Sequence, residues 1–305
     1  MRIFVLGSIN IDRVYRLDHL VAPGETETST AFDLYPGGKG FNQTTALAKA
    51  GALVALVGAV GADGSWLLVP LREAGADTTR VSTIGPTTGH AVIQVDRDGR
   101  NSIIVLPGAN ARITGAQLAA GLSYAHPGDI FLAQNETSCV AEGIRLAKEK
   151  RMTVALNPSP FDERIAALPL DLVDIFLVNE IEAAALAGMP AGSDPGAALV
   201  SLRIKYRDAR FVVTMGEKGA ISSGPGGAAP VSVPAFPVDA VDTTAAGDTF
   251  TGYYLAAVSR GASEADALKR AAAAAAIAVT RPGAAPSVPS RKEVDAFLAS
   301  GSLPG

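Results

Sequence analysis

Short β-branched and aliphatic runs alternate with longer alanine-rich segments along nearly the whole chain, and this alternation limits the possible folds more than any other feature. The runs are continuously apolar and end at Gly, Asn or Pro, which is typical of strands covered on both faces. We expect strands at residues 2–6, 53–60, 130–133, 153–156, 175–178 and 211–214. We expect helices at residues 41–50, 66–74, 137–150, 180–187, 195–207, 247–259 and 263–280. Alternating strands and helices favour an α/β fold, a doubly wound and mostly parallel sheet flanked by helices.

Two segments interrupt this alternation, at about residues 13–35 and 88–107. The second contains two period-two patterns, HAVIQVD and NSIIVL, and the turn DRDG between them is a strong hairpin signal. The two segments could pair into a small β-sheet lid over a binding site, or they could be separate surface hairpins, and periodicity alone favours neither. The chain has no internal repeat and no low-complexity linker, so we expect a single domain over residues 1–305.

The composition excludes several classes of partner. The 305 residues are 48% hydrophobic and 18% charged, with a net charge of −4 and no long basic run, so we expect no nucleic-acid partner. The start, MRIFVLGSIN, lacks the long apolar stretch of a signal peptide, and the alanine-rich run at 270–279 is too short to span a bilayer. Cys139 is the only cysteine, so no intrachain disulfide can form. We therefore expect a soluble cytoplasmic protein without a membrane partner.

The motif DTTAAGDTFTGYYLA, residues 242–256, is the strongest candidate for chemistry. Its small-residue loop leads into a helix that we expect to begin at Asp248. The small side chains would let the N–H groups of Ala246, Gly247 and Asp248 converge at the positive end of the helix dipole, where they could stabilise a phosphoryl group in transfer. The Asp248 carboxylate could accept a proton from an attacking alcohol at the same point. The competing interpretation is that Asp248 is an ordinary helix N-cap.

The motif PGGKGFNQ, residues 36–43, precedes another expected helix. Its three glycines permit close backbone approach or a positive φ. The amide of Asn42 can both donate to and accept from sugar hydroxyls. Alternatively, the motif is a glycine-rich turn that leaves Lys39 in solvent.

Three shorter motifs directly follow or end expected strands. Asn10 and Asp12, in GSINID, lie beyond the carboxyl end of the first strand, where they could hold a ligand or form an Asx turn. Asn179 and Glu182, in NEIE, have the spacing of a capping box. They could instead lie near nucleotide phosphates, with Glu182 reaching magnesium through water. The motif TMGEKG, residues 214–219, could wrap a phosphate or ribose, or be a hairpin turn.

Seven motifs occur in the order and context of one known family. They are GSINID, PGGKGFNQ, VALNPSP, NEIE, TMGEKG, DTTAAGDTF and RPGAAPSVP. On these motifs the chain resembles the ribokinase-like carbohydrate kinases (phosphofructokinase-B type) over nearly its whole length. The resemblance implies an α/β body with a small β lid built from the two insertions, and a homodimer formed through that lid. It also implies a sugar and ATP as ligands, Mg²⁺ as the cofactor of ATP, and K⁺ or a similar monovalent cation as an activator.

The resemblance further implies roles for individual residues. The catalytic residues would be Asp248, as the base, and Ala246 and Gly247, through their amides. The sugar would be held by Asn10, Asp12, Gly38, Lys39, Asn42, Glu136 and Asp248. The nucleotide would contact Asn179, Glu182, Thr214, Gly216, Gly219 and Gly247. The monovalent cation would lie near Asp242, Thr244, Ala278, Arg281, Gly283 and Ser287.

The implied activity is ATP-dependent phosphorylation of the primary hydroxyl of a sugar, with D-ribose giving D-ribose 5-phosphate as the first expectation. The alternatives are a kinase for another sugar or nucleoside of the same family, and a noncatalytic sugar-binding protein on the same fold. Three positions depart from the family pattern. Trp66 replaces a glycine, Ala272 replaces an Asn or His near adenine, and His90 replaces a small or aliphatic residue on a lid strand. We expect Ala272 to loosen the selection of the base and His90 to alter the choice of sugar.

Overall fold

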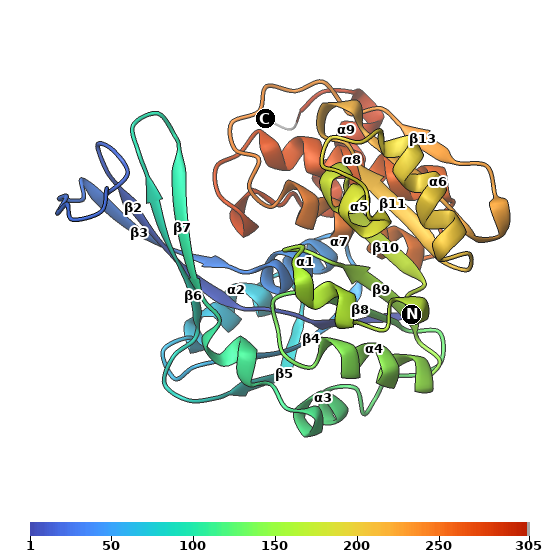
Figure 1. Cartoon of the computed structure of the whole chain (residues 1–305), viewed down its shortest axis with the longest axis horizontal. Coiled ribbons are helices and arrows are strands. Elements are labelled where there is room, and N and C mark those ends of the chain that lie inside the picture. The colour runs from blue at the N-terminus through green and yellow to red at the C-terminus, as the bar shows by residue number, and fades with distance from the viewer. Residues whose placement is uncertain (304–305) are drawn as a thin grey trace.

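The computed structural model describes residues 1–303, and its larger sheet has nine strands in the order β13-β12-β11-β10-β9-β8-β1-β4-β5 (Figure 1). The strands are β1 (Arg2–Leu6), β4 (Leu53–Val60), β5 (Asp77–Thr83), β8 (Ile130–Gln134), β9 (Thr153–Asn157), β10 (Ile175–Asn179), β11 (Arg210–Thr214), β12 (Ala220–Ser223) and β13 (Val231–Val233). All neighbouring pairs are parallel except those of β12, which runs antiparallel to both β11 and β13. The expected doubly wound, mostly parallel α/β fold is confirmed.

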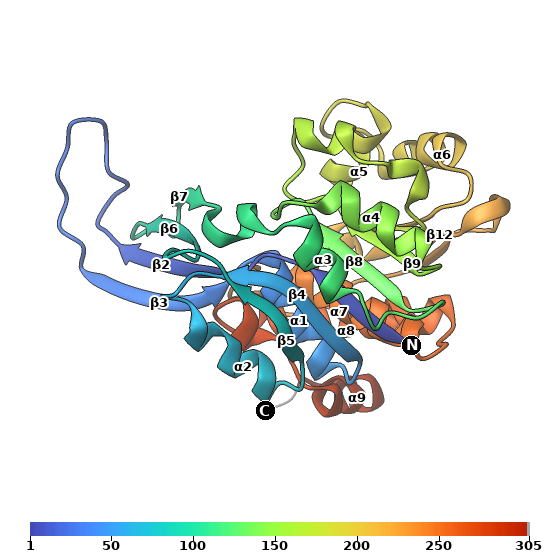
Figure 2. The same cartoon turned by 90° about the horizontal axis from the view of Figure 1, so that it is seen from below.

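Helices cover both faces of this sheet (Figure 2). One face packs against α1 (Lys39–Lys49), α2 (Leu68–Glu73), α7 (Ala246–Ser259), α8 (Glu264–Val279) and α9 (Arg291–Ser300). The other packs against α3 (Gly115–Gly121), α4 (Val140–Glu149), α5 (Glu180–Ala187) and α6 (Pro195–Lys205). Ile3 and Val5 of β1 enter the first core, whereas Phe4 and Leu6 enter the second, because successive side chains of a strand point to opposite faces. Both faces are buried, which explains why the strand is apolar throughout.

Some elements differ from the expected ones. The expected helix 66–74 divides into a 3₁₀ turn (Ser65–Leu67) and α2. The expected helix 137–150 begins only at Val140, because Cys139 before it has a φ of 63°. The sequence did not predict β5, α3 or α9. Within residues 1–303, no helix combines the length and the apolar character that a membrane span needs.

A separate four-stranded sheet projects from one side of this body in both views (Figures 1 and 2). Its strands are β2 (Asn10–Arg16), β3 (Ala31–Gly37), β6 (Gly89–Val95) and β7 (Asn101–Leu106), in the order β3-β2-β6-β7. Parallel pairing of β2 with β6 joins the two segments, so they form one sheet and not two separate hairpins. The single domain over residues 1–305 stays a prediction, and residues 304–305 lie outside the described part of the chain.

Candidate active site

The order of the strands reverses between β1 and β8, because β1 continues to β4 and β5 on one side and β8 continues to β11 on the other. In doubly wound sheets, ligands bind beyond the carboxyl ends of the strands at such a switch point. Polar residues follow the strands at this edge: Asn10 after β1, Glu136 after β8 and Asn179 at the end of β10. The topology therefore brings residues from distant motifs to one place.

The loop after β1 and the start of α1 are in very close contact. Gly7 and Gly40 meet backbone to backbone, and a Cβ on Gly40 would overlap the Cα of Gly7. The Gly40 N–H donates to the Ser8 hydroxyl at 3.2 Å, and the Phe41 N–H donates to the Ser8 carbonyl at 2.8 Å. Gly38, the N-cap of α1, has a φ of 90°, a conformation that favours glycine. The glycines of PGGKGFNQ thus allow α1 to start against this loop.

Two carboxylates lie at this contact. Glu136 accepts hydrogen bonds from the Lys39 N–H at 3.0 Å and from the Ser8 hydroxyl. Asp12 lies beside Gly37, where a Cβ would overlap its carboxylate. Burial, and then the negative charge of Glu136, raise the pKa of Asp12 to about 6. Such a pair of acids suits a ligand rich in hydroxyl groups.

Asn10 is oriented by Asn110, a residue that the sequence analysis missed. Asn110 Nδ2 donates to Asn10 Oδ1 at 2.8 Å and to the Ile9 carbonyl at 3.2 Å. Asn110 Oδ1 accepts from the Ile9 N–H at 3.0 Å. The only signal in the sequence was an asparagine a few residues after a strand, and that pattern is too common to identify a partner.

Helix α7 starts earlier than expected. It begins at Ala246, so Asp248 is its third residue and not its N-cap. The N-cap is Ala245, whose φ of 59° is left-handed and uncommon outside glycine. The Ala246 N–H turns back to the Thr243 carbonyl at 3.2 Å, whereas the Gly247 and Asp248 N–H groups have no partner among the described residues. Two free amides, and not the expected three, therefore lie at the positive end of this 14-residue helix.

Asp248 is 7% exposed, and both of its carboxylate oxygens are held from α1. Oδ2 accepts from Asn42 Nδ2 at 3.1 Å, and Oδ1 accepts from Gln43 Nε2 at 2.8 Å. Asn42 Oδ1 is buried and has no hydrogen-bond donor among the described residues. Because an unpaired buried acceptor is costly, this oxygen fits an incoming hydroxyl group.

A cavity of about 230 Å³ opens at the start of α7. Its lining includes Lys39, Asn157, Asn179, Glu182, Thr214, Ala246, Gly247 and Asp248. Gly216 and Gly219 do not line it. They lie in the turn between the antiparallel strands β11 and β12, so TMGEKG is a hairpin turn. A larger cavity of about 420 Å³ lies near Arg2 and Asp129, at the amino ends of β1 and β8, and contains none of the expected site residues. The larger cavity is therefore not the one that the expected residues line.

Lys39 lies among acidic side chains. Burial would lower the pKa of Lys39, but the charges of Asp248, Glu136 and Glu182 raise it above its usual value. Glu182 also forms a capping box with Asn179: Asn179 Oδ1 accepts from the Glu182 N–H at 2.8 Å, and Glu182 Oε2 accepts from the Asn179 N–H at 3.1 Å. Both residues still line the cavity, so capping α5 does not exclude contact with a ligand.

The residues expected near a monovalent cation join two loops. The Asp242 carboxylate accepts from the Thr244 N–H at 2.9 Å and from the Gly283 N–H at 2.8 Å, which links the loop before α7 to the loop after α8. Burial alone would raise the pKa of Asp242, but these hydrogen bonds lower it below its usual value. Arg281 points to Glu293 instead, at 2.6 Å. The remaining two expected residues lie near the end of α8 and in the turn that follows it: Ala278 and Ser287.

Known proteins are similar to this chain over nearly its whole length. Residues 1–291 match the pfkB family of carbohydrate kinases. The chain belongs to this family. A ribokinase of Haemophilus influenzae is 36% identical over 300 residues, which cover 96% of this chain and 97% of that protein. As a pfkB kinase with such relatives, the protein is an ATP-dependent sugar kinase, as the motifs implied.

Solved structures of pfkB-type kinases agree in fold. The ribokinase of Cryptococcus neoformans, in complex with ADP, has a TM-score of 0.86 and 34% identity and covers 97% of this chain and 98% of its own. The ribokinase of Arabidopsis thaliana, complexed with ribose and ATP, has a TM-score of 0.83 and 30% identity, with the same two coverages.

The departures from the pfkB pattern lie away from the cavity. In the register of β2 and β6, Asp12 pairs with Ala91, whereas His90 pairs with Ile11 on the opposite face of the small sheet. His90 thus faces away from Asp12, which removes the reason for expecting it to alter the choice of sugar. Neither of the other two departures lines the 230 Å³ cavity: Trp66, which is exposed, and Ala272, which is buried in the core on α8.

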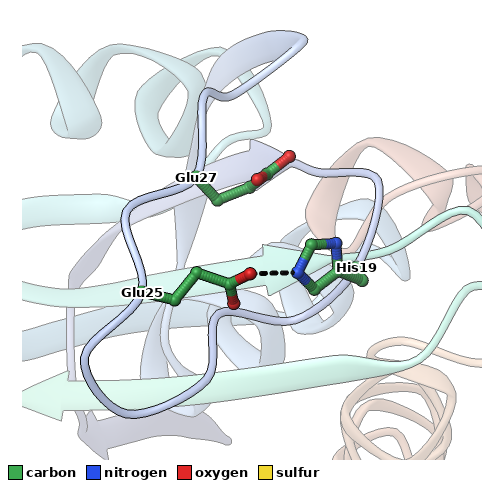
Figure 3. Close-up of side chains that lie close together, drawn as sticks. All are labelled: His19, Glu25 and Glu27. Atoms are coloured by element: carbon green, nitrogen blue, oxygen red, sulfur yellow. Dashed lines mark hydrogen bonds and ion pairs between the residues drawn. The ribbon is translucent and has the colours of Figure 1, made fainter.

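The kinase also holds one group of potential metal ligands, the only such group that lies close together among residues 1–303. It consists of His19, Glu25 and Glu27, in the loop between β2 and β3 (Figure 3). His19 Nε2 lies 2.8 Å from Glu25 Oε1. This pair is exposed and lies outside the cavity, so it belongs to the loop and not to the site.

Proposed function

We propose that this pfkB kinase transfers the γ-phosphoryl group of ATP to the primary hydroxyl of D-ribose and forms D-ribose 5-phosphate. The observation that carries the proposal is the position of Asp248, a buried carboxylate beside two free amides on the wall of the cavity. The ribokinase from Arabidopsis thaliana, solved with ribose and ATP, has the same fold over nearly its whole length.

In this proposal the sugar lies beneath the four-stranded sheet with its primary hydroxyl directed at Asp248. Asp248 accepts the hydroxyl proton while the hydroxyl oxygen attacks the γ-phosphorus in line, and ADP leaves. The Gly247 and Asp248 amides stabilise the charge on the group in transfer. The residues that we assign to the sugar are Asn10, Asp12, Gly38, Lys39, Asn42 and Glu136.

We assign the nucleotide to the cavity on the other side of the start of α7. Asn179, Thr214 and Gly247 line this cavity, and Gly216 and Gly219 would approach the nucleotide from the turn after β11. Mg²⁺ would enter with ATP and neutralise charge on its phosphates. Glu182 fits Mg²⁺ held through water, because it lines the cavity and the capping box engages only one of its carboxylate oxygens, Oε2.

We also propose that K⁺ activates the enzyme from a site near Asp242, Thr244 and Gly283. The lowered pKa of Asp242 keeps a negative charge in the loops that flank the start of α7. Initial rates in KCl should exceed those in tetramethylammonium chloride at the same ionic strength. Equal rates in the two salts would contradict the site.

The four-stranded sheet is, in our proposal, a lid that also joins two copies of the chain. One face of it exposes a patch of large apolar side chains, namely Phe32, Leu34, Ile104 and Leu106, while Ile103 and Val105 are exposed on the opposite face. Patches of this kind mark interaction surfaces. A single cysteine and the use of ATP favour the cytoplasm as the compartment of the enzyme.

The test is ADP release with a panel of ribose, deoxyribose, other pentoses, hexoses and nucleosides. We expect the highest kcat/KM with ribose and a phosphomonoester at its C5 position by ³¹P NMR. A higher kcat/KM with another sugar would replace ribose as the substrate. Sugar binding without ADP release from any member of the panel would instead indicate a noncatalytic sugar-binding protein.

A further inference from the structure

A chain of buried amide side chains lies behind Asp248, and the proposed mechanism does not use it. It consists of Gln43 on α1, Gln134 at the end of β8 and Asn157 at the end of β9, which are 0%, 1% and 9% exposed. We propose that Gln43 is a positioning residue for Asp248: it fixes the orientation of the carboxylate and stabilises its ionised form, and Gln134 and Asn157 fix Gln43 in turn. This inference rests on the proposed role of Asp248 as the base.

The hydrogen bonds around Gln43 use its whole amide. Its Nε2 carries two hydrogens and has two acceptors, Asp248 Oδ1 at 2.8 Å and Asn157 Oδ1 at 3.0 Å. Its Oε1 accepts from Gln134 Nε2 at 2.7 Å. Among residues 1–303, no other side chain donates to this oxygen of Asp248, so Gln43 and Asn42 together set the direction of the carboxylate from the protein side.

Only one orientation of the Gln43 amide satisfies its neighbours. Asn157 Nδ2 donates to the Leu177 carbonyl at 2.8 Å, and a carbonyl can only accept, so Asn157 must present its oxygen to Gln43. An ionised Asp248 also presents only acceptors. A flipped Gln43 would therefore direct its oxygen at two other oxygens and lose its bond from Gln134. The ends of β8, β9 and β10 thus specify which atom faces the base.

The helices that carry Gln43 and Asp248 are locked together one turn further on. A Cβ on Gly252 of α7 would overlap Ala46 of α1, so the two helices cross at close range there. This contact fixes the distance between the amide and the carboxylate. A mobile carboxylate would sample directions away from the acceptor hydroxyl, and small misplacements of a catalytic group lower rates steeply.

Replacement of Gln43 by methionine, which is similar in shape but has no donor, tests the proposal. For Gln43→Met we expect kcat to fall about 10- to 100-fold while the KM for ribose changes less than about threefold. The ionised carboxylate loses a donor, so the acid limb of the kcat–pH profile should move to higher pH. Gln134→Met should shift both readouts in the same direction but less, because Gln134 does not touch Asp248. Gln117→Met, in the cap of α3, is the matched control and should leave kcat and the pH profile unchanged.

Comparison with Asp248→Asn separates the two proposals. If Asp248→Asn keeps near-normal kcat, the proposed base is wrong. If Asp248→Asn is inactive but Gln43→Met keeps the wild-type kcat and acid limb, the positioning role alone is overturned. A lower melting temperature with an unmoved acid limb would also overturn it, since that result indicates a purely structural amide. If Gln43→Met does not fold, Gln134→Met provides the test. A wild-type kcat and an unchanged acid limb for Gln134→Met would reject the positioning role of Gln43.

Discussion

Asp12 and Asp248 are both largely buried carboxylates at the site, but their surroundings differ. Asp248 accepts two hydrogen bonds from side-chain amides. Asp12 has no hydrogen-bond donor among the described residues, and its burial, followed by the negative charge of Glu136, raises the pKa of Asp12 to about 6. The sequence identified both acids from their motifs. It could not distinguish their environments, because the groups that create them lie more than a hundred residues away.

Replacing Asp248 by asparagine should remove the base with little change in shape. We expect kcat for Asp248→Asn to fall about 10²- to 10⁴-fold, because general-base catalysis contributes about that much. The Kd values for ribose and ATP, measured by calorimetry, should stay near those of the wild type. Asp239→Asn, at an exposed position in the preceding loop, is the control. Near-normal turnover by Asp248→Asn would reject the assignment.

We expect Asp12 to lower the stability of the folded chain at neutral pH while it improves the binding of ribose. Between about pH 4 and 6 the folded chain holds the Asp12 proton and the unfolded chain does not, so this group makes the wild type less stable as pH rises through that range. Above pH 6, Asp12→Asn should therefore raise the free energy of unfolding by about 2–3 kcal/mol, with no gain near pH 3.5. The KM for ribose should rise.

Urea denaturation at several pH values measures the stability effect of Asp12→Asn. Asp33→Asn, on β3 and paired with Arg16 at 3.6 Å, serves as the control and should show no such pH-dependent gain. An equal gain for Asp12→Asn at pH 3.5 and pH 7 would contradict the raised pKa.

At the scale of elements, hydrophobic periodicity in the sequence predicts the buried strands. It does not show which residues contact one another in the fold. The buried strands can be identified in the sequence as continuous apolar runs, such as residues 54–60 within β4. Strand β5 has no such apolar run, because it lies at the edge of the sheet and its sequence, DTTRVST, is mostly polar. The start of α7 was misplaced because nothing about Ala245 signals a left-handed turn. The glycines of PGGKGFNQ indicated close approach, but not that Gly7 is the partner of Gly40.

That close approach can be tested directly. Gly40→Ala places a methyl group on the backbone of Gly7, which cannot yield as a flexible side chain would. We expect a loss of about 1–3 kcal/mol in unfolding free energy and a marked loss of activity, because α1 must move away from the site. In Gly115→Ala, on α3, the new methyl meets only the end of Glu142, so stability should change little. Thermal unfolding and ADP release measure both variants, and equal behaviour of the two would count against the packing argument.

At the scale of the molecule, the four-stranded sheet depends on pairing between β2 and β6, whose residues are almost eighty positions apart. Period-two patterns identified the strands, but no local signal could choose between one sheet and two hairpins. The same sheet exposes the apolar patch from which we infer a homodimer.

Two isoleucines of equal exposure test that inference. Ile104, on β7, is 66% exposed, and Ile204, on α6, is 67% exposed. Ile104→Glu should convert the dimer to a monomer, because it places a charge in the interface. The molar mass from light scattering measures this change. Ile204→Glu should remain dimeric. A dimer that survives Ile104→Glu would place the interface elsewhere.

Both oxygens of Asp248 receive their side-chain hydrogen bonds from α1, and none comes from the four-stranded sheet. The side chains of the sheet that covers the acceptor are thus separate from the side chains that support the base, although β3 runs directly into α1 through Gly38. An engineer could exchange Ala91 and Ile93, which share the Asp12 face of β6, to admit a bulkier alcohol while the residues around Asp248 stay unchanged.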